Sequence, residues 1–84
     1  MPHSVVFSVE ARADLRAIDR ETALRLLKAL ARFLATDAGN VKQLEGFEPP
    51  RYRLRIGDWR FVFRKPGDGA IEIIRVRNRR EAYR

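Results

Sequence analysis

Cysteine is absent from this 84-residue chain, and its single histidine is His3. Without cysteine there can be no disulfide framework, no thiolate nucleophile and no metal–thiolate site. His3 lies in a terminal segment that we expect to fray, so we assign no histidine general base to the folded body. The acidic residues lack the spacing of paired catalytic or metal-binding carboxylates. We therefore expect neither a metal ion nor any other cofactor.

Long apolar runs are also missing. No stretch approaches the ~20 apolar residues that a helix needs to cross a bilayer, and polar residues interrupt the first few positions too early for a secretion signal. We therefore expect a cytoplasmic protein with no membrane partner. The length predicts a single domain over residues 1–84 with a small core.

The excess positive charge is confined to the C-terminal part of the chain. The net charge is +7, and residues 51–84 contain eleven Lys and Arg against four Asp and Glu, whereas residues 1–50 contain seven of each. Arginines alternate with apolar residues in much of 51–56 and 59–64, which is typical of strands with one face on the core and one in water. The sequence therefore predicts an arginine surface.

Gly57 and Asp58 separate these two strands and have the composition of a two-residue hairpin loop, which places Arg55 opposite Arg60. Like charges facing each other cost a few tenths of a kcal/mol to ~1 kcal/mol. We therefore interpret the surface as a site for an anionic partner, because the planar guanidinium suits phosphate oxygens. The alternative is that the arginines only keep a solvated face soluble.

The remaining pattern predicts an α+β fold: an N-terminal strand and an antiparallel two-helix hairpin, then a three-stranded antiparallel meander, with the helices packed on one face of the sheet. The expected elements are a strand over 4–7, a helix over 9–18 capped by Ser8, a helix over 20–35 capped by Asp19, a connector over 41–50, and strands over 51–56, 59–64 and 70–77. The second helix is expected to bury Leu24, Leu27, Leu30, Ala31 and Leu34.

A turn over 66–69 precedes the last strand. If it pairs Lys65 with Ala70, Arg75 lies opposite Arg60 in the basic row. The basic face then also carries Arg77, Arg79, Ile71 and Ile73. Guanidinium groups in such a row could stabilise the charge of a phosphoryl transition state, and RNA brings its own nucleophile in the 2′-hydroxyl. Arginine hardly deprotonates in proteins, so the proton transfers stay unassigned.

Residues 44–47, 52–63 and 76–84, which end in Arg79-Arg80-Glu81-Ala82-Tyr83, resemble the RelE/ParE superfamily of bacterial type II toxins, and the RelE branch in particular. The resemblance covers nearly the whole chain. It implies a metal-independent, ribosome-dependent endoribonuclease, or mRNA interferase, whose partners are messenger RNA and the ribosome. It also implies a cognate antitoxin, and contact with operator DNA only through that antitoxin. From the exposed basic face we expect the antitoxin to bind through an acidic or amphipathic segment.

The resemblance also implies roles for individual residues. Arg60 would bind the scissile phosphate, Arg79 would stabilise the transition state or leaving group, and Tyr83 would orient the nucleotide. Arg55 would help to activate the 2′-hydroxyl, and with Arg53 it would grip the substrate phosphates. We add three further arginines of the predicted face as RNA-binding residues, namely Arg51, Arg75 and Arg77.

One position departs from the family pattern, because Asn78 stands where many relatives have a histidine. An amide cannot act as an acid or a base near neutral pH, so general-acid catalysis is in doubt. Two alternatives therefore stay open. The chain could be a ParE-like inhibitor of DNA gyrase, or a toxin that has lost its catalytic activity and serves as an antitoxin-binding and operator-binding module.

Overall fold

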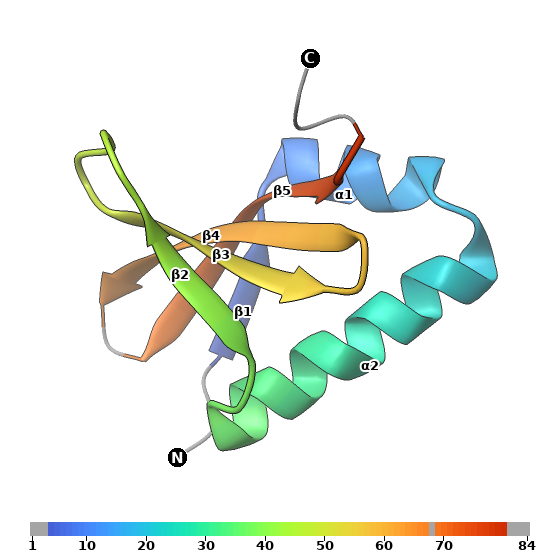
Figure 1. Cartoon of the computed structure of the whole chain (residues 1–84), viewed down its shortest axis with the longest axis horizontal. Helices are drawn as coiled ribbons and strands as arrows, with labels where there is room; N and C mark the ends of the chain where they lie inside the picture. Colours follow the sequence, from blue (N-terminus) through green and yellow to red (C-terminus); the bar gives the residue numbers. More distant parts are fainter. Residues whose placement is uncertain (1–3, 68, 81–84) are drawn as a thin grey trace.

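Two helices and a five-stranded mixed sheet form the α+β fold in the computed structural model, which describes residues 4–67 and 69–80 (Figure 1). In chain order the elements are β1 (Ser4–Phe7), α1 (Val9–Ala17), α2 (Arg20–Thr36), β2 (Asn40–Leu44), β3 (Arg51–Ile56), β4 (Trp59–Gly67) and β5 (Ala70–Asn78). The strand order is β1-β5-β4-β3-β2. β1 runs parallel to β5, and the other neighbours are antiparallel.

Both helices begin at the predicted caps. The Ser8 hydroxyl accepts a hydrogen bond from the Ala11 N–H at 3.0 Å, and the Asp19 carboxylate accepts one from the Thr22 N–H at 3.0 Å. Each cap satisfies a backbone donor that the first turn leaves without an intrahelical partner. α2 ends where Asp37 adopts a left-handed conformation with a φ of 59°, a common way for a helix to stop.

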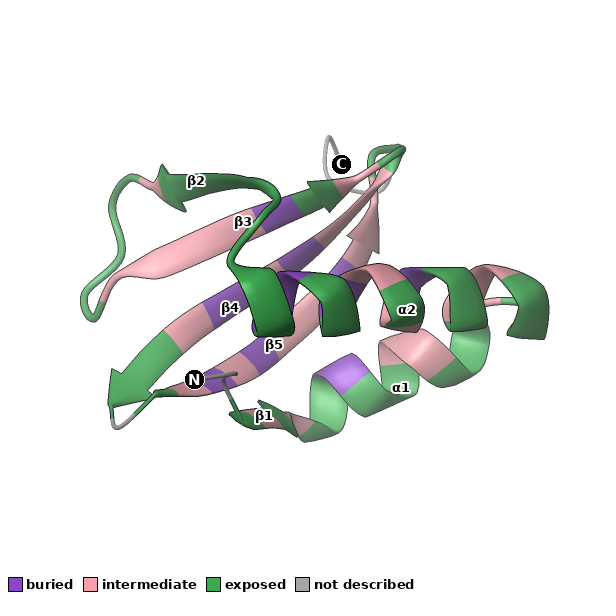
Figure 2. Ribbon diagram, turned by 90° about the horizontal axis from the view of Figure 1, so that it is seen from below, coloured by how far each residue is buried: buried purple, intermediate pink, exposed green. Residues whose placement is uncertain are grey.

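The core lies between the helices and one face of the sheet, and α2 crosses that face (Figure 2). The buried residues of the sheet are Leu54, Phe61, Phe63, Ile71, Ile73 and Val76, and those of the helices are Ala11, Leu26, Leu30, Phe33 and Leu34. Large apolar side chains of this kind each contribute about 1.5–3 kcal/mol when fully buried. One face of the sheet is therefore committed to the core.

The apolar side of α2 is rotated from its predicted position. Leu26 and Phe33 are buried, whereas Leu24 is 48% exposed and Ala31 is exposed. Leu30 and Leu34 are buried as predicted. At 3.6 residues per turn, positions 26, 30, 33 and 34 form one narrow stripe, and position 24 lies about half a turn away from position 26. The prediction for Leu24 and Ala31 was wrong.

β2 replaces part of the predicted connector over 41–50. It pairs antiparallel with β3, so that Lys42 lies opposite Arg53 and Asn40 opposite Arg55. Most of its residues are exposed, and it therefore lacks the alternation that identifies a half-buried strand. Gly39 precedes it, where an added Cβ would lie 2.8 Å from the Leu54 side chain. Backbone pairing at the edge of the sheet, rather than apolar periodicity, creates this strand.

The pairing of β4 with β5 also differs from the prediction. Phe61 pairs with Val76 and Phe63 pairs with Ile73. Two steps along β4 thus match three along β5, which is a β-bulge. The register already differs from the prediction at the turn, where Gly67 rather than Lys65 pairs with Ala70. A second irregularity lies between Arg64 and Gly67, so the segment between the two irregularities is shifted by one residue.

The turn pairing and the bulge each change which residues share a face. Because Gly67 rather than Lys65 pairs with Ala70, Arg77, rather than Arg75, lies opposite Arg60. Ile71 and Ile73 are only 1% and 0% exposed and belong to the core, so their predicted place on the basic face was wrong. A hairpin register extrapolated from one turn cannot reveal a bulge several residues away, because the inserted residue reverses the side-chain alternation beyond it.

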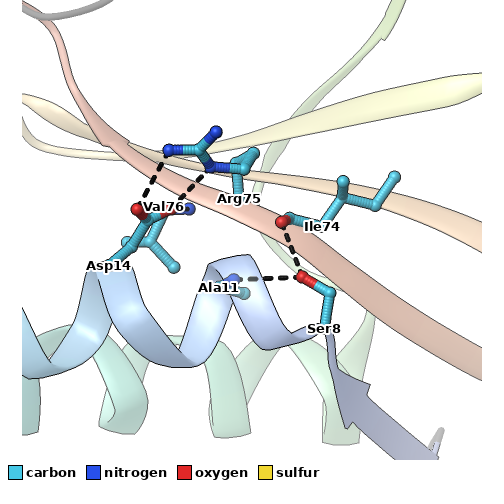
Figure 3. Close-up of polar contacts among 6 residues, drawn as sticks. All are labelled: Ser8, Ala11, Asp14, Ile74, Arg75 and Val76. Atoms are coloured by element: carbon cyan, nitrogen blue, oxygen red, sulfur yellow. Dashed lines mark hydrogen bonds and ion pairs between the residues drawn. The ribbon is translucent and has the colours of Figure 1, made fainter.

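Beyond the end of β1, residues at the start of α1 and within it make hydrogen bonds to the outer edge of β5. The Ser8 N–H donates to the Ile73 carbonyl at 2.9 Å, and the Ser8 hydroxyl donates to the Ile74 carbonyl at 2.8 Å. Further along, the Asp14 carboxylate accepts from the Val76 N–H at 2.8 Å and from the Arg75 guanidinium at 2.9 and 3.1 Å (Figure 3). The bulged segment is thus held by a helix instead of a strand.

The substitution Asp14→Ala tests this edge. It leaves the part-buried Val76 N–H without its acceptor, and we expect the free energy of unfolding at pH 7 to fall by about 1–3 kcal/mol, as measured by urea denaturation. The substitution Glu21→Ala, at an exposed position of α2, is the control and is expected to change it by less than about 0.5 kcal/mol. Equal effects of the two substitutions would contradict the assignment.

The same carboxylate makes stability depend on pH. Partial burial of Asp14 raises its pKa, but hydrogen bonds from Arg75 and the Val76 N–H outweigh it, and the net pKa lies below the usual value. Asp14 therefore stabilises the fold above its unfolded-state pKa, and this contribution is lost as the pH falls through the folded-state pKa. We expect wild type to lose more stability than Asp14→Ala on acidification below about pH 4. Parallel pH profiles would contradict this.

Candidate nucleic-acid interface

Three arginines lie side by side on the face of the sheet opposite the core. Arg55 of β3 pairs with Arg60 of β4, as predicted, and Arg60 pairs with Arg77 of β5. Paired residues on neighbouring strands project to the same face with Cβ atoms about 4.5–5.5 Å apart. We call these three residues the arginine row. Arg55 is exposed, and Arg60 and Arg77 are partly exposed.

Arg79 adjoins one end of the arginine row. Its N–H donates to the Asp58 carbonyl at 2.6 Å, which holds the chain after β5 against the turn between β3 and β4. Arg79 itself is exposed. Asn78 pairs with Trp59, and its side-chain oxygen accepts from the Arg80 N–H at 3.0 Å. This amide therefore shapes the backbone that presents Arg79.

A second basic row runs parallel to the first. It contains Lys42, Arg53, Val62 and Arg75, which pair across β2, β3, β4 and β5. Sequence reasoning missed Lys42, because it lies in the segment predicted to be a connector. No periodic signal in 40–44 could have found it, since only the pairing of β2 with β3 brings Lys42 onto this face.

The arginines of this face differ in their partners. Arg64 forms an ion pair with Glu72, Arg75 forms one with Asp14, and the Arg51 guanidinium lies 4.7 Å from the centroid of the Phe47 ring. Within residues 4–67 and 69–80, in contrast, no carboxylate forms an ion pair with any member of the arginine row. The mutual repulsion in that row is therefore not relieved by a direct ion pair with an acidic group of the described chain.

The structure thus brings together most of the predicted site. Arg53, Arg55, Arg60, Arg77 and Arg79 lie at one end of the face, and Arg51 lies at the other end of β3. Arg75 is on the neighbouring row, with its guanidinium bound at the α1 edge by Asp14. Tyr83 and His3 lie outside the described residues.

The arginine row offers donors and positive charge but no group that titrates near neutral pH. Several guanidinium groups within one patch can bind a phosphate and stabilise additional negative charge on it. In the described ranges, no three His, Cys, Asp or Glu residues are grouped so that they could hold a metal ion. Neither helix is long and apolar enough to cross a membrane.

The fold is shared with chains of solved toxin–antitoxin complexes. A chain of the archaeal RelE–RelB complex from Pyrococcus horikoshii OT3 is 22% identical with a TM-score of 0.72, and the match covers 94% of this chain and 97% of the other. A chain of the RelBE2 complex from Mycobacterium tuberculosis is 25% identical with a TM-score of 0.72, and the match covers 94% of this chain and 100% of the other. A chain of the RelB–RelE complex from Methanococcus jannaschii is 20% identical with a TM-score of 0.73, and the match covers 93% of this chain and 94% of the other. No curated protein sequence matches significantly.

The family is defined more directly by sequence. The model of the ParE toxin of the type II toxin–antitoxin system parDE matches residues 5–83. The chain therefore belongs to the ParE toxin family, which confirms the predicted membership of the RelE/ParE superfamily.

The like charges of the arginine row predict a cost in stability. We expect Arg60→Gln to raise the free energy of unfolding by a few tenths of a kcal/mol to about 1 kcal/mol, because it removes the repulsion between Arg60 and the like charges of Arg55 and Arg77 on the neighbouring strands. The gain should shrink as salt is added. The matched control is Arg64→Gln on the same strand and face, which loses the ion pair with Glu72 and should give no gain. Thermal denaturation at two ionic strengths distinguishes them, and a destabilised Arg60→Gln would contradict the interpretation.

Proposed function

We propose that this toxin is an endoribonuclease that cleaves messenger RNA on the ribosome. The observation that supports the proposal is the arginine row, whose three adjacent guanidinium groups have no ion-pair partner in the described chain. Such a row binds a phosphate without first having to break internal ion pairs. RNA supplies the nucleophile, so the protein needs to contribute mainly orientation and charge.

In the proposed reaction, the 2′-oxygen attacks the adjacent phosphorus and the bond from phosphorus to the 5′-oxygen of the next nucleotide breaks. The products are a 2′,3′-cyclic phosphate and a free 5′-hydroxyl. Arg60, in the middle of the row, binds the scissile phosphate, and Arg79 stabilises the charge that develops on the leaving oxygen. Arg53 and Arg55 hold neighbouring phosphates, and Tyr83 orients the nucleotide. Water takes up the proton of the 2′-hydroxyl and supplies the proton that the leaving 5′-oxygen gains, because arginine stays charged.

Substitution of the row tests this proposal. Arg60→Ala and Arg79→Ala are each expected to lower cleavage by about 100-fold or more, and to abolish growth arrest on induced expression without antitoxin. Primer extension on a cellular message measures the cleavage. Arg12→Ala, at an exposed position of α1, is the control and should leave cleavage unchanged. Full growth without message cleavage, from a correctly folded wild-type protein, would instead favour a toxin that has lost its activity.

The second candidate is inhibition of DNA gyrase, and the match to a ParE toxin model favours it. The same fold would then bind a protein, without chemistry of its own. A supercoiling assay with purified gyrase separates the two functions. Gyrase inhibition together with intact messages in arrested cells would contradict the endoribonuclease proposal.

We also propose an antitoxin as the partner, as in the similar complexes. A groove of 380 Å³ lies between α2 and β3, and three cations of α2, Arg25, Lys28 and Arg32, line one side. Its other lining residues include Phe33, Leu54, Ile56 and Arg55. Among the described residues no carboxylate lines it, so an amphipathic segment with acidic side chains is complementary to it. Since Arg55 also belongs to the arginine row, a segment bound here would reach the proposed active site.

Charge reversal on the groove tests this partner. With the cognate antitoxin, Lys28→Glu is expected to raise the Kd about tenfold at low ionic strength and less at high ionic strength. Arg16→Glu, at an exposed position of α1, is the control and should leave the Kd nearly unchanged. Isothermal titration calorimetry measures both. Equal affinities of the two variants would place the antitoxin elsewhere.

A further inference from the structure

A second hollow lies on the same side of the sheet as the arginine row, at the opposite end of β3. This cleft has a volume of 250 Å³. Its floor is formed by β4 and β5, and one wall is the loop between β2 and β3, which lies on the far side of the sheet from α2 (Figure 1). The residues that line it include Phe47, Glu48, Arg51, Glu10 and Ile74.

Phe47 gives the cleft an aromatic surface. Its side chain is among the exposed large hydrophobics at 43%, whereas Phe33, Phe61 and Phe63 are buried. Arg51 stacks over the ring at 4.7 Å from its centroid, which holds the ring at the wall and adds a second planar group. Exposed aromatic rings beside arginines are the usual platforms on which single-stranded nucleic acids stack their bases.

The carboxylates of the cleft indicate what kind of group it accepts. Glu72 is engaged by Arg64, but Glu10 and Glu48 form no ion pair within the described ranges, although the chain carries a net charge of +7. An ionised carboxylate can only accept hydrogen bonds. The cleft therefore suits a neutral, planar group with N–H donors, and it is unfavourable for a second phosphate.

The cleft and the arginine row can serve one ligand. Arg51 lines the cleft and Arg55 belongs to the row, and both lie on β3 with the same side-chain orientation. Four residues of a strand span about 13 Å. A few nucleotides of an extended single strand cover that distance, so a base could enter the cleft while a phosphate of the same strand lies on the row.

We propose that this cleft binds one nucleobase of the RNA strand held by the arginine row, and that it favours bases with an exocyclic amino group. The inference rests on the proposed endoribonuclease function and assigns it a specificity site. Phe47 stacks on the base, and Glu48 accepts a hydrogen bond from the amino group. Uracil, which lacks an exocyclic amino group, should bind most weakly.

Direct binding of short oligonucleotides tests the cleft without requiring cleavage. The probe is a 2′-O-methyl oligoribonucleotide, which cannot supply a nucleophile, in a series where one base at a time is removed to leave an abasic position. For the wild-type protein, we expect loss of the base at one particular position to raise the Kd roughly 5- to 100-fold. In Phe47→Ala the intact and abasic probes should bind equally well. Leu24→Ala, an exposed apolar residue of α2, should behave as wild type.

A second variant tests the preference for an amino group. At the sensitive position, wild type should bind adenine, cytosine or guanine more tightly than uracil, and Glu48→Gln should lose most of this difference, because an amide can also donate to the uracil carbonyls. Unchanged discrimination in Glu48→Gln would contradict the role of this carboxylate.

Failure of the cleft and failure of the proposed function give different results. Arg60→Ala should weaken every probe of the series by a similar factor. If wild type binds RNA and Arg60→Ala weakens it, but no abasic position matters, the cleft is not a base site while the proposed function stands. If wild type binds no probe at all, the cleft proposal is contradicted, and the proposed function is decided separately by primer extension on a cellular message. If Phe47→Ala affects only antitoxin binding, the cleft is a protein-binding site and the proposal is wrong.

Discussion

Burial of one sheet face determines which way every strand arginine points. Leu54, Phe61 and Val76 pair across β3, β4 and β5 and are almost completely buried. Because side chains alternate along a strand, their neighbours Arg55, Arg60 and Arg77 must face the opposite side. A shift of one residue in any of the three strands would place guanidinium groups in the core, which is prohibitively costly without partners. The hydrophobic core thus aligns the basic surface.

The bulge in β5 is the second constraint, and α1 supports it. Beyond the bulge, β5 has no neighbouring strand on its outer edge, and Ser8 and Asp14 accept or donate the hydrogen bonds that a strand would otherwise make. Asp14 also binds Arg75. One carboxylate therefore removes one arginine from the set available to a ligand and holds the backbone of Val76, next to Arg77.

On the face of the sheet opposite the core, the arginines with ion pairs lie apart from the arginines of the row. Ion pairs are found where the face is peripheral, at Arg64 and Arg75, and are absent among the described residues of the arginine row. Functional sites commonly retain unfavourable local arrangements that the rest of the fold must compensate. Here the compensation comes mainly from the core formed with α2, since no acidic side chain of the described chain forms an ion pair with the row.

Much of the fold could be predicted from local patterns, because those patterns depend on neighbours in sequence. The caps at Ser8 and Asp19, the strand alternation and the two-residue turn at Gly57 all act over a few residues, and with them the pairing of Arg55 with Arg60 was predictable. The family resemblance had the same origin, in the residues of these strands and the C-terminal segment.

Other features arise only when distant segments meet. β2, and with it the place of Lys42, depends on backbone pairing with β3. The exchange of Arg75 for Arg77 depends on the pairing of Gly67 with Ala70 at the turn. The burial of Ile71 and Ile73 depends on a bulge next to Arg75, which binds Asp14 61 residues away in the chain. Alternation and capping are local, so the sequence alone determined that there would be an arginine face. Hydrogen bonds between remote elements have no periodic signature, and so only the tertiary structure decided which arginines share it.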